Sequence, residues 1–306
     1  TQFASSAASD VYKRQAGVHS GDSTAVLPPF SITESMIKEI EDKSTTLAKA
    51  LGVKGLLNIQ FAIKDDTLFI LEANPRASRT MPFVSKVTGN QIIKAGTLLM
   101  LGHSLDSIKK TTNYLNSSTN KVAIKKAIFP WSRFPAEDTM LGPEMKATGE
   151  VLGIGRSFGV ALNKAYAAAG VEINENEKGI FVSLSDQEKP NFIKIVKTYS
   201  DLGFKIYSTY GTGEYLKNSE INSTIVGRAD ETFPTSLTIL QDKLISLVIN
   251  TPTFANEYTD GWKIRRLSHE TGVAVVSSVR EAEAFLKAFL ETSKSFEDME
   301  AIQNVS

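Results

Sequence analysis

Two short hydrophobic segments, residues 56–63 and 67–71, are predicted to form a β-hairpin, which constrains the fold of this chain more than any other feature. The polar triplet Lys64-Asp65-Asp66 lies between them and predicts the turn. The second segment runs directly into a carboxylate, a carboxamide, a proline and a guanidinium. Hard cations such as magnesium prefer oxygen ligands, and an arginine fork suits phosphate oxygens. The pattern therefore indicates the floor of a metal–nucleotide site.

The length of the connection decides which side chains share a face of this hairpin. If the connection holds an odd number of residues centred on Asp66, Gln60 lies opposite Glu72. Asn58 and Asn74 then share that face, because side chains alternate along a strand. A shift of one residue would place Gln60 and Glu72 on opposite faces. The other face would carry three apolar side chains that point into the core: Leu57, Ile59 and Phe61.

Two arginines, Arg76 and Arg79, follow the second strand within a few residues. The competing interpretation of the whole string is a polar, solvent-facing strand that ends in an Asn-Pro turn. Such a strand has no need of two guanidinium groups, so we favour the metal–nucleotide site. Phosphoryl transfer depends mainly on positioning and charge neutralisation, which metals and arginines supply without a side-chain nucleophile.

The composition bounds the class of protein. The chain has 306 residues, 42% hydrophobic and 22% charged, a length that favours two domains. Lys plus Arg and Asp plus Glu both number 34, so no net field indicates a nucleic-acid or membrane partner. The absence of cysteine excludes disulfides, thiol catalysis and thiolate zinc sites. Neither a membrane-span pattern nor a signal-peptide core is present, and we therefore expect a cytoplasmic location.

The first third of the chain is predicted to contain helices around the hairpin. Residues 1–15 are small, polar and without pattern, and we interpret them as a non-native or disordered leader. Residues 30–51 predict a helix with Ser31 as N-cap and Glu34 as its capping-box partner. A further helix is expected near residues 90–101, followed by a polar surface loop at 111–120. The apolar face of the first helix would consist of Ile37, Ile40, Leu47 and Leu51.

Later in the chain, strands and helices alternate. A strand at 127–131 and a helix that begins at Ser157 and ends before Gly170 are expected first. Four apolar segments then predict strands: residues 180–184, 204–208, 244–250 and 273–277. Helices are predicted at 190–202 and 279–292, the second with a capping box formed by Ser278 and Glu281. This alternation predicts a small parallel α/β sandwich with a ligand crevice at its strand ends.

Longer strings resemble a known enzyme family. NIQFAIKDDTLFILEANPRASRTMPFVSKVTG, GVHSGDST and LGPEMKATGEVLGIGRSF resemble the second ATP-grasp unit of the carbamoyl-phosphate synthase large subunit. The region after Gly179 resembles the methylglyoxal-synthase-like regulatory domain of that family. The resemblance implies an α/β fold: the C-terminal portion of an ATP-grasp fold, an antiparallel sheet with helices, followed by a parallel-sheet sandwich. It also implies four regions: a leader at 1–15, an ATP-grasp part at 16–110, a connecting region at 111–172, and an allosteric domain at 173–306.

The resemblance implies roles for residues of the first region. Two magnesium or manganese ions would be held by Gln60, Glu72 and Asn74. ATP would be contacted by six residues: Gly17, Val18, His19, Ser20, Gln60 and Glu72. Arg76 and Arg79 would hold the transferring phosphate or its acceptor. In the family this half phosphorylates carbamate, made from bicarbonate and ammonia, to carbamoyl phosphate for pyrimidine and arginine biosynthesis. A glutaminase small subunit delivers the ammonia, and K⁺ is a further expected ion.

The last region is predicted to bind a phosphorylated ligand. STYGTGEYL places the hydroxyls of Thr209 and Thr212 and the bare backbone of Gly211 directly after a strand, which suits an anion at a helix N-terminus. The resemblance implies a pocket for a nucleotide effector such as UMP, lined by Lys189, Thr209, Gly211, Thr212, Arg228, Asn250 and Thr251. Arg228 stands where lysine is common in the family, which leaves the effector open. A threonine that only forms a turn is the alternative at Thr251.

Parts of the sequence also suggest other functions. The lobe with the nucleotide-gripping lysine lies upstream of Ala16 in the family, so we expect a C-terminal fragment that does not catalyse the overall reaction alone. A stand-alone effector-binding module without catalysis is the second possibility. A methylglyoxal synthase would need a catalytic histidine in its pocket, and the chain has none between His103 and His269.

Overall fold

The chain divides into two compact units, each described here by itself. Unit 1 comprises residues 1–128, 141–156 and 298–306, and unit 2 comprises residues 129–140 and 157–297. The predicted domain limits at 16, 111 and 173 stay predictions. The computed structural model describes residues 17–29, 31–111, 121–134, 138–171, 179–228, 231, 234–251 and 259–292. The predicted leader and residues 112–120 of the predicted loop lie outside the described residues.

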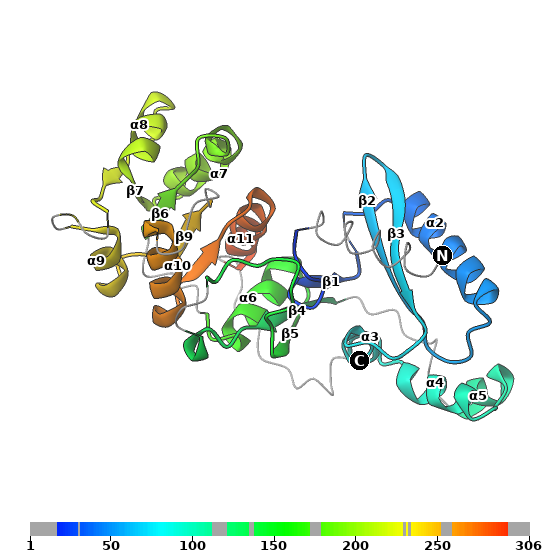
Figure 1. Cartoon of the computed structure of the whole chain (residues 1–306). Coiled ribbons are helices and arrows are strands. Elements are labelled where there is room, and N and C mark those ends of the chain that lie inside the picture. Colours follow the sequence, from blue (N-terminus) through cyan, green and yellow to red (C-terminus); the bar gives the residue numbers. More distant parts are fainter. Residues whose placement is uncertain are drawn as a thin grey trace. The chain divides into compact units, whose positions relative to one another are not determined.

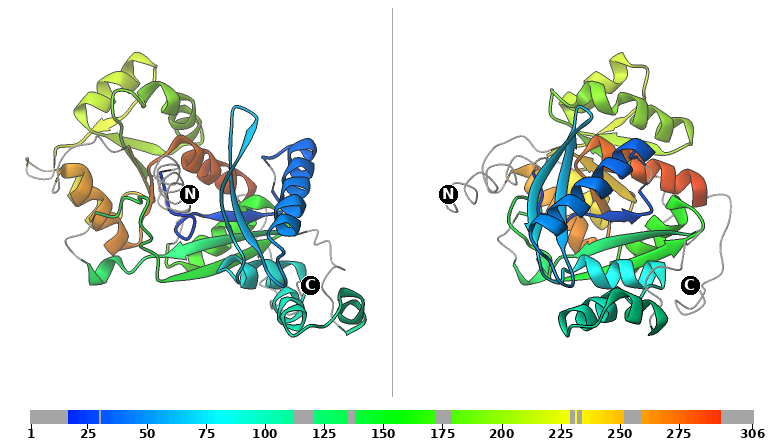
Figure 2. Two further views of the ribbon diagram at one scale, coloured as in Figure 1. Left: turned by 45° about the vertical axis from the view of Figure 1, so that its right-hand side comes forward. Right: turned by 90° about the vertical axis from the view of Figure 1, so that its right-hand side faces the viewer.

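Unit 1 contains a three-stranded antiparallel sheet in the order β1-β4-β5. Its strands are β1 (Ala25–Leu27), β4 (Val122–Ile128) and β5 (Gly149–Gly155), and Figure 2 shows β1 in blue beside the green strands. The strand predicted at 127–131 was wrong in position. Pro130 lacks the N–H that a ladder needs, and a short 3₁₀ turn, Trp131–Arg133, follows it. Two lysines within β4 hid its apolar character, although Ala123 and Ile124 are fully buried.

The predicted hairpin is present as β2 (Asn58–Lys64) and β3 (Thr67–Asn74). Its turn holds the two residues Asp65 and Asp66, with φ of 49° and 55°, so the odd connection predicted from the sequence was wrong. The register shifts between Gln60 and Phe61, where Leu71 is the extra residue of a β-bulge. The extra residue of the bulge has the same effect on the register as a turn with an odd number of residues. The predicted pairing of Gln60 with Glu72 is therefore confirmed.

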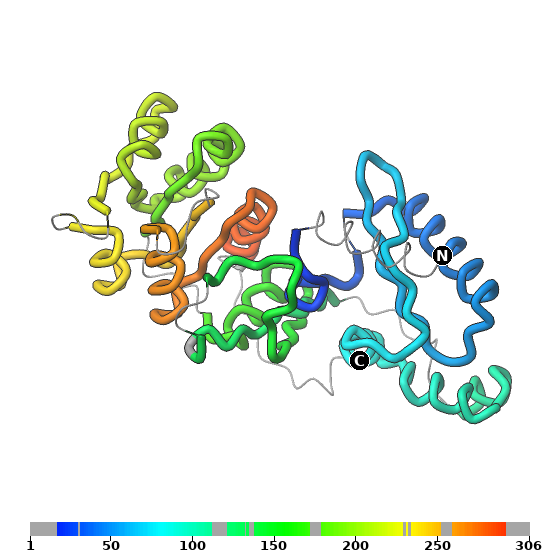
Figure 3. The backbone as a smooth tube through the Cα atoms, in the orientation of Figure 1, coloured from blue at the N-terminus to red at the C-terminus, as the bar shows by residue number. Residues whose placement is uncertain are grey.

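In the described part of unit 1, four helices accompany the hairpin: α2 (Glu34–Ala50), α3 (Thr80–Thr88), α4 (Ile92–Met100) and α5 (Leu105–Thr111). The trace in Figure 3 runs from α2, in blue, into the lighter-blue hairpin. The predicted N-cap of α2, Ser31, was wrong. Thr33 is the N-cap, because its extended backbone lets its hydroxyl accept from Met36 N at 3.3 Å. Glu34 therefore lies in the first turn, where the helix dipole favours a carboxylate.

Unit 2 is built on a five-stranded parallel sheet in the order β10-β9-β6-β7-β8, as the alternating pattern predicted. Its strands are β6 (Gly179–Ser183), β7 (Lys205–Ser208), β8 (Thr224–Ile225), β9 (Leu247–Asn250) and β10 (Ala274–Val276). The central strands are buried on both faces, since Phe181, Val182, Val248 and Ile249 are fully buried. The chain moves from β6 toward one edge and later returns to β9 on its other side, so the ends of β6 and β9 form the switch point.

The helices of unit 2 form two layers (Figure 1). One layer contains α6 (Phe158–Ala168), α7 (Lys189–Asp201), α8 (Tyr210–Asn218) and α11 (Val279–Thr292). The other contains α9 (Ser236–Gln241) and α10 (Asp260–Thr271). Ser157 caps α6 as predicted. The capping box of α11 is shifted: Ser278 Oγ accepts from Glu281 N, but the Glu281 carboxylate accepts from Ser277 N.

Among the described residues, none of the helices combines the length and apolar character that crossing a bilayer requires.

Candidate functional site

The hairpin of unit 1 presents the first group of predicted site residues. Gln60 pairs with Glu72, and Asn58 with Asn74, so four oxygen-bearing side chains lie on one face of the ladder. All four are half-buried. Ile59 and Phe61 lie on the opposite face as predicted, but they too are only half-buried, so this face is not a closed core in the described residues. The arrangement gives a polar platform with an apolar underside.

The donor set of this platform fits a hard cation that arrives with other ligands. Within the described residues, no three His, Cys, Asp or Glu side chains lie close enough to hold a metal by themselves. Gln60 and Asn74 add amide oxygens to the single carboxylate of Glu72. Magnesium accepts such a sparse set, because it usually keeps waters and binds substrate phosphates. The site therefore suits a metal–nucleotide complex better than a bare ion.

The two predicted arginines lie immediately beyond β3 and are exposed. Arg76 Nη1 donates to the carbonyl of Ala77 at 2.9 Å. Arg79 is the N-cap of α3, and its Nη1 lies 3.0 Å from the sulfur of Met145. Both arginines thus follow, within five residues, the end of the strand that carries Glu72 and Asn74.

The predicted nucleotide loop, Gly17 to Ser20, is fastened to the segment before β5. Gly17 has φ of +83°, which an L side chain rarely adopts. His19 N donates to Gly142 O at 2.8 Å, and His19 Nδ1 accepts from Gly21 N at 3.0 Å. A neutral His19 ring therefore carries its proton on Nε2. Val18 and Ser20 lie on the same loop, and no described hydrogen bond gives them a more specific role.

Asp22 is a buried anchor of this loop that the sequence analysis missed. Its side chain is 3% exposed and accepts from the backbone N–H groups of Lys146 and Ala147 at 2.8 and 2.9 Å. Lys125 Nζ donates to Gly21 O at 3.3 Å from the adjacent strand. Burial lowers the pKa of Lys125 from its ordinary value, although Glu150 and Asp22 oppose this effect. The sequence signal was the small-residue context of GDST, which resembles an ordinary turn.

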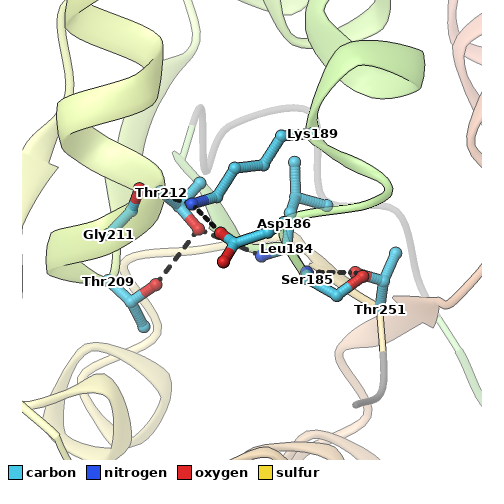
Figure 4. Close-up of polar contacts among 8 residues, drawn as sticks. All are labelled: Leu184, Ser185, Asp186, Lys189, Thr209, Gly211, Thr212 and Thr251. Atoms are coloured by element: carbon cyan, nitrogen blue, oxygen red, sulfur yellow. Dashed lines mark hydrogen bonds and ion pairs between the residues drawn. The ribbon is translucent and has the colours of Figure 1, made fainter.

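In unit 2 the carboxyl ends of three adjacent strands gather most of the predicted effector residues (Figure 4). Two consecutive N–H groups after β6 are held by threonines from either side. Leu184 N donates to Thr212 Oγ1 at 3.1 Å, and Ser185 N donates to Thr251 Oγ1 at 2.8 Å. Thr212 also accepts from Thr209 Oγ1 at 3.2 Å, so its own hydroxyl proton can be donated elsewhere. The Thr251 hydroxyl therefore fixes the backbone after β6, and its role toward an effector stays a prediction.

Lys189 connects the start of α7 to the start of α8. Its Nζ donates to Asp186 Oδ1 at 2.6 Å and to Gly211 O at 2.8 Å, which leaves one ammonium donor for a ligand (Figure 4). The Lys189 side chain is 11% exposed, whereas that of Asp186 is 92% exposed. A Cβ on Gly211 would meet only Lys189 Nζ at 3.8 Å, so the start of α8 is open to an approaching group. The first turn of a helix also offers unpaired N–H groups.

The Asn250 side chain is bound by Arg265, which in turn binds Asp138. The sequence did not predict a role for either of these two residues. Arg265 Nη1 donates to Asn250 Oδ1 at 2.7 Å, and the same guanidinium donates to both carboxylate oxygens of Asp138. Arg228 differs from Lys189 in its exposure: its side chain is 73% exposed, and its Nε lies 3.9 Å from Asp260 Oδ2.

Comparison with known proteins assigns both units. Residues 10–108 match the family described as "Carbamoyl-phosphate synthase L chain, ATP binding domain", and residues 191–277 match the "MGS-like domain". The chain is 38% identical over 297 residues to "Carbamoyl phosphate synthase large chain, C-terminal section" of Aquifex aeolicus. That alignment covers 93% of this chain and 55% of the relative. The chain belongs to the carbamoyl-phosphate synthase large-chain family.

A second relative covers nearly the same share of this chain. The "Carbamoyl phosphate synthase large chain" of Archaeoglobus fulgidus is 41% identical over 283 residues, which covers 92% of this chain and 26% of that protein. The chain thus spans about half or about a quarter of the length of these curated carbamoyl-phosphate synthase relatives. A biotin carboxylase subunit of pyruvate carboxylase aligns with 47% of the chain and 37% of its own length, at 17% identity and a TM-score of 0.36. A likeness of that size supports no argument about function.

Proposed function

We propose that this chain supplies two parts of a carbamoyl-phosphate synthase: the metal–nucleotide floor on which ATP phosphorylates carbamate, and a regulatory domain that binds an effector. The observation that carries the first part is the pairing of Gln60 with Glu72, beside the pair Asn58 and Asn74, within the residues that match the ATP-binding family. A ladder face rich in oxygen atoms suits a metal–phosphate complex, because hard cations prefer oxygen ligands.

In this proposal Gln60, Glu72 and Asn74 hold two magnesium or manganese ions, which neutralise phosphate charge when bound. Arg76 and Arg79 stand at the end of β3, where their guanidinium groups can bind phosphate or acceptor oxygens. The loop from Gly17 to Ser20 contacts the nucleotide, with His19 offering its Nε2–H as a donor. K⁺ is a further ion in the proposal. Catalysis is then positioning and electrostatic stabilisation, not nucleophilic chemistry.

The proposed partners follow from the reaction. Carbamate derives from bicarbonate and from ammonia that a glutaminase small subunit delivers, in the cytoplasm. The chain spans only part of the length of its relatives, so these partners are proposed for the whole protein.

The regulatory part of the proposal rests on the cluster around Lys189. An ammonium, two threonine hydroxyls and the start of α8 surround the end of the central strand, which suits the phosphate of a nucleotide effector such as UMP. This observation also favours the second candidate function, an effector-binding module that works without catalysis. The two candidates differ only in whether the hairpin binds a metal–nucleotide complex.

Binding measurements on the 306-residue chain test both candidates. We expect Mn²⁺ with ADP to bind, followed by calorimetry and by the Mn²⁺ electron paramagnetic resonance signal. Glu72→Gln keeps the side-chain size and removes the charge, and it should weaken this binding by at least about tenfold. Asp65→Asn removes the same charge at the hairpin turn and should leave the binding unchanged. Equal losses in both variants, or no binding by the unmodified chain, would exclude the metal–nucleotide floor.

UMP binding distinguishes the second candidate. If UMP binds and Thr212→Ala abolishes that binding while Mn²⁺–ADP does not bind at all, the chain is an effector-binding module. If neither nucleotide binds, both assignments fail for this chain.

A further inference from the structure

A buried arginine in unit 2 connects a predicted ligand residue to a carboxylate from another part of the chain. Arg265 lies on α10 and is 5% exposed. Its Nε and Nη2 donate to Asp138 at 3.2 and 2.6 Å, and its Nη1 donates to Asn250 Oδ1 at 2.7 Å. The guanidinium therefore donates to Asp138 on one side and to Asn250 on another.

The chemistry of the guanidinium decides how the Asn250 amide is oriented. A guanidinium carries only donors, so the amide must turn its oxygen toward Arg265 and its NH₂ away. Asn250 Nδ2 then lies 3.4 Å from Ser183 O, at the carboxyl end of β6. A bond of that length is weak, and the NH₂ group has a second hydrogen. In this orientation Asn250 offers donors, not acceptors, at the switch point between β6 and β9.

Asp138 holds the arginine in the position that this orientation needs. A buried guanidinium without a carboxylate would be costly, and a bidentate pair also fixes the plane of the group. Gly261 lies close to the pair formed by Arg265 and Asn250. A Cβ on Gly261 would lie 3.1 Å from Arg265 Nη1 and 3.4 Å from Asn250 Oδ1, so a side chain there would make the Arg265 guanidinium shift by a few tenths of an ångström.

We propose that Arg265 is a positioning residue of the effector pocket, which fixes the Asn250 amide as a donor toward an acceptor oxygen of the ligand, and that Asp138 holds Arg265 in place. The ligand class is an anion or carbonyl-bearing molecule, such as a nucleotide monophosphate. This inference rests on the proposed regulatory function. It adds a selection rule: the group that meets Asn250 must accept hydrogen bonds.

Arg265→Lys tests the role against a matched control in the same helix. Arg266 is 6% exposed, and the described hydrogen bonds of its guanidinium go to Glu270 and to Phe134 O. Both Arg265→Lys and Arg266→Lys lose a buried guanidinium, and both should lower thermal stability. Calorimetry with UMP, and separately with inorganic phosphate, should show affinity at least about tenfold weaker for Arg265→Lys and unchanged for Arg266→Lys. Equal affinities in the two variants overturn the inference while the proposed function stands.

Two milder variants keep the test valid if Arg265→Lys does not fold. Asn250→Asp can still pair with Arg265, so stability should be retained, but the lost NH₂ donor and the added charge should abolish UMP binding. Gly261→Ala favours the helix and presses on the pair, so it should weaken UMP binding without destabilising unit 2. Unchanged UMP affinity in either variant overturns the inference.

A measurement without ligand completes the test. The side-chain NH₂ resonances of Asn250, assigned by their loss in Asn250→Asp, should shift in Arg265→Lys and Gly261→Ala but not in Arg266→Lys. A shift of the same size in Arg266→Lys overturns the inference. If the unmodified chain binds neither UMP nor phosphate, the proposed effector function fails, and the inference fails with it.

Discussion

Gln60 lies directly opposite Glu72 across the β2–β3 ladder, although the turn that joins their strands holds an even number of residues. Without a correction, a two-residue turn would pair Gln60 with Leu71. The extra residue of the bulge restores the pairing and places the amide and the carboxylate on one face. A bulge beside a functional side chain is a common way to re-aim it. The register of this site is therefore set near the site itself and not at the turn.

The turn can consequently be improved without moving the site. Asp66 has φ of 55°, in the left-handed region where glycine is favoured. Asp66→Gly should stabilise the hairpin by about 0.5–1 kcal/mol, and Asp66→Ala should destabilise it. Hydrogen exchange of the β2 and β3 amides would report a two- to fivefold change in protection, on the order expected from that free energy. Mn²⁺–ADP affinity should be unchanged in Asp66→Gly, and a loss of affinity would show that the turn sets the register.

Two glycines of α8 are expected to respond differently to alanine. A Cβ on Gly213 would lie 2.7 Å from Ser208 Oγ and 2.9 Å from Ile225, whereas one on Gly211 would meet only Lys189 Nζ at 3.8 Å. Gly213→Ala should lower the free energy of unfolding of unit 2 by about 1–3 kcal/mol. Gly211→Ala should leave it unchanged or raise it by up to about 1 kcal/mol. Trp131 and Trp262 both belong to unit 2, so tryptophan fluorescence in urea reports the difference; equal effects would contradict it.

Thr212 is expected to act through its oxygen. The side chain is 1% exposed and accepts the N–H of Leu184. Thr212→Val keeps the shape but leaves that buried donor unpaired, which should cost about 1–3 kcal/mol of unfolding free energy. Thr212→Ser retains the oxygen and should cost less than about 1 kcal/mol. The same urea titration measures both, and a loss in Thr212→Ser as large as that in Thr212→Val would contradict the expectation that the oxygen contributes more than the methyl group.

Lys125 should make the stability of unit 1 depend on alkaline pH. Burial lowers its pKa in the folded chain below the ordinary value of 10.5, so the unfolded chain binds more protons between these two values. Stability should then rise with pH through that interval, because the charged form is the one that burial penalises. Lys125→Met should remove this rise. The difference in free energy of unfolding between the variant and the unmodified chain should therefore shift in favour of the unmodified chain as the pH approaches 10.5. Lys38→Met, at an exposed position of α2, is the control in urea titrations followed by circular dichroism; identical pH profiles would refute the expectation.

The sheet of unit 2 was predictable because its strands are short, continuous apolar segments separated by helices. Strands of unit 1 were harder to recognise. Lys125 and Lys126 interrupt the apolar pattern of β4, and the three glycines of Gly149–Gly155 lower the apparent strand character of β5. Helix α10 was not predicted, since the polar sequence around Arg265 and Arg266 lacks an apolar stripe.

In the candidate sites, contacts between residues near each other in the sequence were predictable, and contacts between distant residues were not. Gln60 and Glu72 belong to neighbouring strands, so alternation and a turn were enough to pair them. The contact of Arg265 with Asp138 joins residues 127 positions apart, and no local pattern predicts such a pair. Bulges are also hard to predict, because a single extra residue leaves the hydrophobic pattern almost unchanged.

The segment Phe129–Met140 leaves unit 1 after β4, belongs to unit 2, and returns to unit 1 before β5. It brings Phe134 and Asp138 to the two arginines of α10. A truncated protein that starts at residue 157 or 179 would contain every strand of the parallel sheet, yet both arginines would lose acceptors. Anyone who dissects this chain should therefore graft the segment back, or replace Arg265 and Arg266 with neutral side chains, before judging whether the regulatory part stands alone.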